Sequence, residues 1–198
     1  MGVPSFTVDI EDLINAESPN FLMKDPNLVG NANTAYQSSN VKNAIEYHEF
    51  LAIRAYTDDL YKGINPALRS GQAGKWAVIS SSAESGLAKL AQHPVHSQTG
   101  TMTRGLTLSD SQVNDIFPDD GTFSDKTFMS SSYDPKKSFD GNVKLTIDTD
   151  TPQAKVGDIS VYGDGEAEVL FGPDGKFDVV SKSKQSDGNW KIHVKEKK

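Results

Sequence analysis

The sequence contains no cysteine among its 198 residues. Disulfide bonds, thiolate nucleophiles and cysteine-ligated zinc are therefore excluded. A chain without cysteine suits a reducing cytosol, and it equally suits a protein that must unfold and refold during delivery.

Long apolar runs are missing as well. No stretch approaches the length of a membrane-spanning helix, and the N-terminus lacks the basic start and apolar core of a signal peptide. Hydrophobic residues make up 36% and charged residues 24% of the chain, which is typical of a soluble globular domain. We expect a soluble protein without membrane contact, whose export signal, if it has one, lies on a larger parent.

Clustered positive charge is also scarce. The net charge of -7 argues against a nucleic-acid binder, because affinity for a phosphate backbone depends on clustered Lys and Arg. The lysines between Lys182 and Lys198 fit the solvated face of a strand better. We expect no nucleic-acid partner.

Several familiar site patterns are absent. The chain has neither a Gly-x-x-x-x-Gly-Lys loop for nucleoside triphosphates nor a Gly-x-Ser-x-Gly hydrolase elbow. Asp148-Thr149-Asp150 lacks the further spaced ligands of a calcium loop. The histidines lack the spacing of metal ligands, and we expect no metal site. These histidines are His48, His93, His96 and His193.

Apolar periodicity predicts helices in the first half of the chain. Residues 1–39 predict irregular structure with one short helix over 10–16. Asn40 is expected to cap a helix that begins at Val41, and Thr57-Asp58-Asp59 to cap a second helix that ends near Leu68. A third helix is expected over 83–91.

The second half changes to β patterns. Ser109 and Gln112 form the sequence pattern of a capping box, which predicts a short helix ending near Phe117. Helices followed by strands with short connections predict an α+β domain. The expected strands cover residues 101–106, 127–132, 143–148, 156–162, 166–171, 177–182 and 190–195.

Two glutamates stand close together after a glycine-rich turn, in the segment 163–171. Side chains on a strand alternate between faces, so Glu166 and Glu168 are expected on one face, about 7 Å apart, with Ala167 facing the core. Like charges at this spacing raise the pKa of one carboxyl group unless a cation or donor lies nearby. Taken alone, the pattern more often marks a solvated acidic edge strand.

Three further segments are compatible with ligand binding. Arg104-Gly105 combines a fixed fork of donors with a glycine that lets a ligand approach the backbone, although a lone Arg more often forms a surface salt bridge. Ser130-Ser131-Ser132 places hydroxyl groups on a strand, where serine has low propensity, and is as compatible with a plain strand end. Phe139 suits a stacking platform or, more often, a core position.

The order and spacing of these segments resemble a known family. An arginine strand, then Phe128-x-Ser130-x-Ser132, then Glu166-x-Glu168, resembles the mono-ADP-ribosyltransferases of the arginine-serine-glutamate (R-S-E) class. The resemblance is specific and covers about residues 41–195. It also includes segments that are similar to bacterial ADP-ribosylating toxins, namely Arg54 to Thr57, Tyr61 to Arg69 and Asp134-Pro135.

The resemblance has limits in the sequence. The middle position of the serine motif is usually threonine, and Ser131 keeps its hydroxyl group. Residues 1–40 resemble no known family and are assigned to an N-terminal extension, while residues 41–198 form the catalytic domain. The implied fold has N-terminal helices that flank two small, roughly perpendicular antiparallel or mixed sheets, with an NAD cleft between them.

The resemblance implies how NAD, the co-substrate, is held. Arg104 with Gly105 binds the phosphates of NAD, a role that suits a permanent bidentate cation. Ser130 orients Glu168, which binds the ribose 2′-hydroxyl and stabilises the positive charge that develops on the sugar. Ser131 and Ser132 are also assigned to the cofactor site, and Phe139 stacks on the nicotinamide ring or packs beside it.

The resemblance also implies the acceptor. Glu166 positions a target-protein arginine and takes its proton, because an arginine with a pKa above about 12 arrives charged. Tyr162 contacts the target protein, or is simply an aromatic residue at a strand end.

The predicted function is therefore transfer of ADP-ribose to an arginine of a target protein. The chain resembles the catalytic end of a bacterial toxin or interbacterial effector, secreted or delivered by a parent toxin or secretion system and active in the target cytoplasm. A cognate immunity protein that covers the NAD cleft is an expected partner. The alternatives are an NAD glycohydrolase that uses water as acceptor and an inactive binding module of the same fold.

Overall fold

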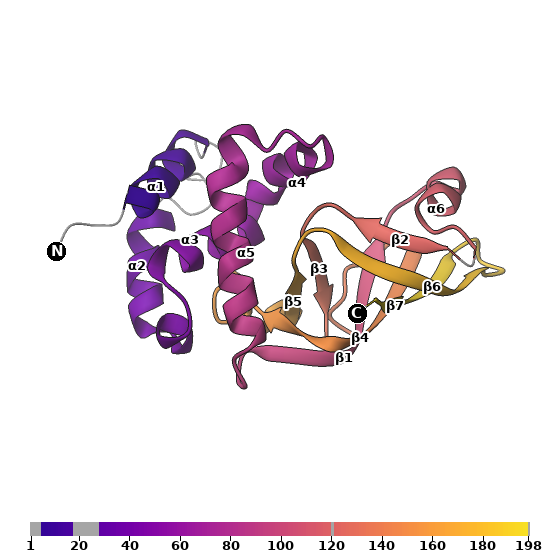
Figure 1. Cartoon of the computed structure of the whole chain (residues 1–198). Helices are drawn as coiled ribbons and strands as arrows, with labels where there is room; N and C mark the ends of the chain where they lie inside the picture. The colour runs from indigo at the N-terminus through magenta and orange to yellow at the C-terminus, as the bar shows by residue number, and fades with distance from the viewer. Residues whose placement is uncertain (1–4, 18–27, 120, 198) are drawn as a thin grey trace.

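The computed structural model describes residues 5–17, 28–119 and 121–197. The chain divides into a helical half and a β half, which lie side by side (Figure 1). No helix among the described residues is long and apolar enough to cross a membrane. The helices are α1 (Ser5–Glu17), α2 (Leu28–Ser38), α3 (Tyr47–Ala55), α4 (Tyr61–Arg69) and α5 (Ala77–Ala91), followed within the β half by α6 (Asp110–Ile116).

The β half is a mixed sheet whose strands have the order β1-β3-β5-β4-β7-β6-β2, with β1 also paired to β4. The β4–β7 pair is parallel and the other pairs are antiparallel. The strands are β1 (Ser97–Leu106), β2 (Thr122–Asp125), β3 (Met129–Ser132), β4 (Val143–Lys155), β5 (Glu168–Phe171), β6 (Gly175–Lys184) and β7 (Trp190–Glu196).

The predicted α+β class is confirmed. The strands of the two expected small sheets are joined by hydrogen bonding into one sheet. The long strand β4 pairs with β7 along its first half and with β5 at Ala154 and Lys155. Hydrogen bonding therefore continues from the β1-β3-β5 group to the β7-β6-β2 group, and the strands form one continuous network.

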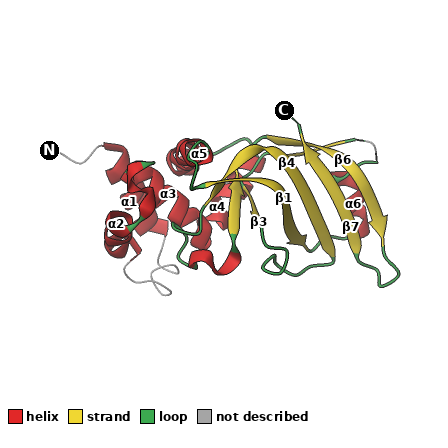
Figure 2. Cartoon of the chain, turned by 90° about the horizontal axis from the view of Figure 1, so that it is seen from below, coloured by secondary structure: helices red, strands yellow, loops and turns green. Residues whose placement is uncertain are grey.

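The structure has two apolar cores, one within the β half and one that joins the two halves. One core lies between α6 and the strands, around Phe117, Phe171 and Phe177. The other contains the inner faces of the helices together with Phe128 and Ile159 from the β half. Ile10, Ile14 and Ala32 are buried in this second core, so α1 and α2 pack onto the same helical half. In Figure 2, α1, α2 and α3 lie at one end of the molecule and β6 and β7 at the other.

Helix starts agree with the sequence at α6 and differ elsewhere. In residues 1–39, where one short helix over 10–16 was expected, α1 begins at Ser5 and the second helix, α2, was not predicted. The capping box of Ser109 and Gln112 is present at α6, as predicted. The helix expected at Val41 is wrong: residues Asn40–Asn43 form a single 3-10 turn, and α3 begins at Tyr47. The reason is a second capping box, in which the Glu46 amide donates to the Glu49 carboxylate at 2.8 Å.

The predicted break at Thr57-Asp58-Asp59 is also wrong. The chain continues from α3 into α4 through a π-helical turn over Tyr56–Leu60, without a side-chain cap. Likewise, α5 begins at Ala77 rather than at residue 83. The strand expected over 156–162 is absent, because its apolar residues Val156 and Ile159 turn into the core of the helical half. Strand β2 was not predicted.

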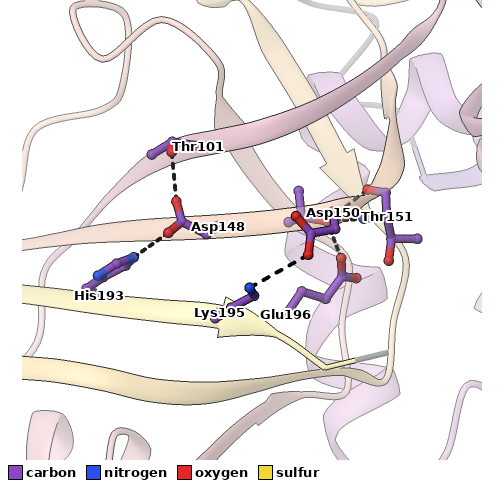
Figure 3. A network of polar contacts seen from close by, with 8 residues as sticks. Thr101, Asp148, Asp150, Thr151, His193, Lys195 and Glu196 are labelled. Carbon is purple, nitrogen blue, oxygen red and sulfur yellow. Dashed lines mark hydrogen bonds and ion pairs between the residues drawn. The ribbon is translucent and has the colours of Figure 1, made fainter.

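A polar network crosses the sheet on β1, β4 and β7 (Figure 3). The Asp148 carboxylate accepts from the Thr101 hydroxyl at 2.7 Å and lies 2.7 Å from Nε2 of His193. Nearby, Lys195 lies 3.7 Å from Asp150. None of these five residues lines the cleft described below, so the network joins strands and has no part in the site.

Candidate active site

A cleft of about 550 Å³ lies between the helical half and the β half. Its walls come from the π-helical turn and α4 on one side, and from β1, β3, β5 and the loop before β5 on the other. The cleft brings together seven of the residues predicted from the sequence, which are Arg104, Gly105, Ser130, Phe139, Tyr162, Glu166 and Glu168. The other two, Ser131 and Ser132, line a narrow recess that adjoins the same Arg104, Ser130 and glutamate side chains.

Arg104 projects from β1 into this cleft. Its Nη1 donates to the carbonyl of Ser130 at 2.8 Å, which ties β1 to β3. Burial lowers the pKa of Arg104 from its usual value, and the charge of Arg69 lowers it further. A second guanidinium group therefore lies close to the first.

Arg69 lies near Arg104 but is not among the residues that line the cleft. It ends α4, and its Nη2 donates to the Thr127 hydroxyl at 3.4 Å.

Glu168 is the first residue of β5, opposite Ser132 of β3, and only 6% of it is exposed. Burial, with a smaller contribution from the charge of Glu166, raises the pKa of Glu168 to about 7, although a hydrogen bond from Ser130 and the charge of Arg104 act in the opposite direction. The carboxyl group therefore titrates near neutral pH, and its ionised form is stabilised by the two residues that the sequence placed beside it.

Glu166 does not lie on the strand, and the prediction of one strand carrying both glutamates is wrong. It ends a 3-10 turn over Gly163–Glu166, and Ala167 then adopts a left-handed conformation with φ 48° and ψ 47°. This turn, and not strand alternation, directs both carboxylates into the cleft. Burial raises the pKa of Glu166. The predicted burial of Ala167 is confirmed.

The turn is held from β3. The Ser132 hydroxyl lies 2.8 Å from the Glu166 carbonyl and 2.9 Å from the Asp134 carbonyl. A left-handed non-glycine residue costs on the order of 1–3 kcal/mol and persists only when its surroundings fix it. Ser132 supplies part of that support at Ala167.

Two aromatic residues stand at the rim of the cleft. Phe139 is 63% exposed, which excludes the alternative of a core position. Tyr162 is 52% exposed, and its hydroxyl donates to the Asp58 carboxylate at 3.3 Å. The alternative of a strand-end aromatic fails for Tyr162, because residues 156–162 form turns.

The backbone at Gly105 is approached by another part of the chain, whereas the sequence predicted that a ligand would approach it. A Cβ added to it would lie 1.8 Å from the carbonyl oxygen of Phe139. The space that glycine leaves beside the backbone is therefore taken by the chain at Phe139, which fixes the position of that residue beside Arg104.

Two residues that line the cleft, Tyr56 and Asn65, were not predicted from the sequence. The Tyr56 hydroxyl donates to the carbonyl of Phe128 at 3.2 Å and accepts from the Asn65 amide at 3.0 Å. Burial raises the pKa of Tyr56, so the phenol stays neutral and acts as a donor. These contacts hold the helical wall of the cleft against the start of β3.

The site combines three chemical capacities. Arg104 supplies a fixed cation for a phosphorylated ligand, and the charge of Arg69 lies near it. Glu168 supplies a shielded carboxylate for positive charge that appears during a reaction, and Glu166 a second carboxylate nearer the loop. Among residues 5–17, 28–119 and 121–197, no group of three or more His, Asp or Glu is placed to hold a metal ion.

Comparison with known families gives a match over most of the chain. The family model described as NAD:arginine ADP-ribosyltransferase matches residues 35–198. A protein of Pseudomonas putida (strain GB-1) named NAD(+)--protein-arginine ADP-ribosyltransferase Tre1 is 38% identical over 136 residues, which cover 66% of this chain and 26% of that protein. A protein of the same name from Serratia proteamaculans (strain 568) is 29% identical over 159 residues, covering 78% of this chain and 33% of that protein. The chain thus spans about a quarter to a third of these relatives.

Solved structures share the fold at low sequence identity. The type III effector XopAI from Xanthomonas axonopodis pv. citri matches all of this chain and 89% of its own, with a TM-score of 0.75 and 16% identity. The ADP-ribosyltransferase HopU1 of Pseudomonas syringae pv. tomato DC3000 matches 95% of this chain and 87% of its own, with a TM-score of 0.69 and 17% identity. At these identities the two structures establish the fold alone.

Proposed function

Because the chain belongs to the NAD:arginine ADP-ribosyltransferase family, we propose that it transfers ADP-ribose from NAD to an arginine side chain of a target protein. The observation that carries the proposal is the meeting of Arg104, Ser130, Glu166 and Glu168 in one cleft. These residues come from β1, β3 and the turn before β5. The cleft volume of about 550 Å³ lies within the usual range for ligand pockets.

NAD supplies the ADP-ribosyl group and a nicotinamide that leaves with the electron pair of the broken glycosidic bond. Arg104 binds the phosphates, since its guanidinium forms a fixed cation on the cleft wall, and Arg69 adds charge beside it. Phe139 offers an exposed ring at the rim, which suits stacking on the nicotinamide. Ser131 and Ser132 border the recess next to these groups.

Glu168 acts on the sugar. Its carboxylate accepts from the ribose 2′-hydroxyl and stabilises the positive charge that develops as the nicotinamide departs. Ser130 orients this carboxylate and favours its ionised form. Burial makes the charge effective, because electrostatic interactions strengthen when water is excluded.

Glu166 acts on the acceptor. An arginine side chain has a pKa above about 12 and arrives as a cation, which a carboxylate binds well. Glu166 then takes the proton released as the guanidine nitrogen bonds to the ribose carbon, so the reaction yields ADP-ribosyl-arginine, nicotinamide and one proton.

We also propose a setting for this activity. The curated relatives are longer chains, so this segment serves as the catalytic end of a toxin or effector that other segments or a secretion system deliver. It acts in the cytoplasm of the target cell, and an immunity protein covers the cleft in the producing cell. The exposed rim of Phe139 and Tyr162 supports both the target and the immunity protein as partners.

A second candidate function is hydrolysis of NAD, with water as the acceptor. Phe139 and Tyr162 are exposed at the rim, so water can enter the outer part of the cleft. Incubation of the protein with labelled NAD and a target-cell lysate separates the two functions. Labelled protein supports transfer, while free ADP-ribose without any labelled protein contradicts it. Absence of NAD turnover supports the third possibility, an inactive binding module.

A further inference from the structure

The π-helical turn over Tyr56–Leu60 brings acidic side chains to the cleft. Its residues Asp58 and Asp59 line the cleft together with Glu166 and Tyr162. A π-helical turn is rare and often marks a functional position, because the extra residue shifts side chains out of the regular helix register. The proposed chemistry gives neither aspartate a role.

Asp58 and Tyr162 meet across the mouth of the cleft. The Tyr162 hydroxyl donates to Oδ1 of Asp58 at 3.3 Å, which links the helical wall to the loop that carries Glu166. Asp58 is 6% exposed while Tyr162 is 52% exposed, so the tyrosine ring stands over a mostly buried carboxylate. The contact fixes the loop at the point where an acceptor must enter.

The surroundings of Tyr162 are strongly acidic. Burial raises the pKa of Tyr162, and the charges of Asp58, Asp59 and Glu166 raise it further, which places all three carboxylates around one phenol. Lys62 forms an ion pair with Asp59, the next residue of the turn. A carboxylate as buried as Asp58 acts on an incoming cation with less screening than an exposed one does.

On the basis of the proposed function, we propose that Asp58 is a specificity residue for the acceptor. Its carboxylate attracts the cationic guanidinium to the mouth of the cleft. By accepting a hydrogen bond from the Tyr162 hydroxyl, it also fixes the position of the Tyr162 ring. The guanidinium then passes along this ring to reach Glu166. The inference rests on the contact of Asp58 with Tyr162 and on their shared position with Glu166 in the cleft.

The test uses Asp58→Asn, which removes the charge and keeps an oxygen that accepts from Tyr162. Agmatine, a small cationic guanidine, serves as acceptor, and NAD hydrolysis is measured in parallel. We expect the KM for agmatine to rise about tenfold, the effect of losing one charge-assisted contact. The ratio of transfer to hydrolysis falls by the same factor at low agmatine.

Asp115→Asn is the matched control, because Asp115 is an exposed aspartate of α6, outside the cleft. It should keep the KM for agmatine of the unchanged protein. If Asp58→Asn does not fold, Tyr162→Phe takes its place: it removes the tether and should also raise the KM for agmatine relative to hydrolysis.

Two results overturn the inference. One is a variant KM for agmatine equal to that of the unchanged protein. The other is a parallel loss of transfer and hydrolysis, which would make Asp58 a structural support of the whole cleft. Failure of the proposed function looks different: the unchanged protein would then cleave NAD without modifying agmatine or any protein.

Discussion

The Ser132 hydroxyl lies 2.8 Å from the carbonyl oxygen of Glu166, which joins the end of β3 to the turn before β5. Two residues earlier on the same strand, Ser130 donates a hydrogen bond to the carboxylate of Glu168. The serine segment therefore holds Glu168 through its side-chain carboxylate and Glu166 through its backbone carbonyl. This arrangement gives each glutamate a separate duty that can be tested.

Replacement of Glu168 by Gln should abolish most NAD cleavage. Removal of a preorganised electrostatic contact in the transition state commonly costs about a hundredfold or more in kcat. The loss should affect transfer and hydrolysis alike, because both begin with cleavage of the same bond. Release of nicotinamide, followed with labelled NAD, measures it, and unchanged turnover would show that the site is assigned wrongly.

Activity should rise with pH across neutrality. The pKa of Glu168 is raised to about 7, and only the ionised carboxylate stabilises positive charge on the sugar. We expect kcat/KM for NAD to increase through about pH 7 and to level off above it, since this parameter reports the free enzyme. A profile that stays flat from pH 5.5 to 8.5 would contradict the assignment.

Stability should change with pH in the opposite direction. The folded pKa of Glu168, about 7, lies above its ordinary 4.5, so between these values the folded protein holds a proton that the unfolded chain has released. The free energy of unfolding therefore falls as pH rises through this window. Relative to Glu168→Gln, the unchanged protein should lose about 2.5 kcal/mol between pH 5 and pH 8.

Denaturant unfolding of both proteins at several pH values measures this difference. The variant serves as its own reference, because other titrating groups are common to both chains. Two parallel curves of stability against pH would contradict the raised pKa of Glu168.

Replacement of Glu166 by Gln should separate the two activities. The variant keeps Glu168, so it should still hydrolyse NAD, while transfer to agmatine falls about a hundredfold because the base for the acceptor is lost. Free ADP-ribose and ADP-ribosyl-agmatine are quantified in one reaction. Equal loss of both products would place Glu166 on the sugar side of the reaction.

Gly105→Ala should destabilise the fold. The added Cβ would meet the Phe139 carbonyl at 1.8 Å, and such overpacking costs on the order of 1–3 kcal/mol. Gly172→Ala is the matched control, because a Cβ there would have no neighbour within 4 Å. Thermal unfolding compares the two. If Gly105→Ala proves as stable as Gly172→Ala, the close approach at Gly105 is not real.

The sequence predicted which residues meet in the cleft better than it predicted the local structure. Charged and hydroxyl residues at Arg104, Ser130 and Glu168 carry a strong family pattern, and the structure brings them together. The π-helical turn at Tyr56–Leu60 follows no side-chain cap, so the acidic pair within it was mistaken for a helix start.

Sequence periodicity could not predict the left-handed conformation of Ala167. Alternation predicts a strand through Glu166, Ala167 and Glu168, whereas the left-handed residue is fixed by contacts from β3. Tertiary contacts likewise determine the structure of residues 156–162. This segment is apolar enough for a strand, but its residues Val156 and Ile159 are buried in the core of the helical half. Asn65 was missed for a similar reason, since it reaches the cleft only once α4 packs beside the sheet.

The central claim is that this cleft modifies arginine, and mass spectrometry of target-cell proteins after incubation with the protein and NAD tests it most directly. The account predicts ADP-ribose attached to arginine side chains, and no such modification when Glu166→Gln is used. Consumption of NAD without modified arginine, or ADP-ribose found only on other residue types, would contradict it.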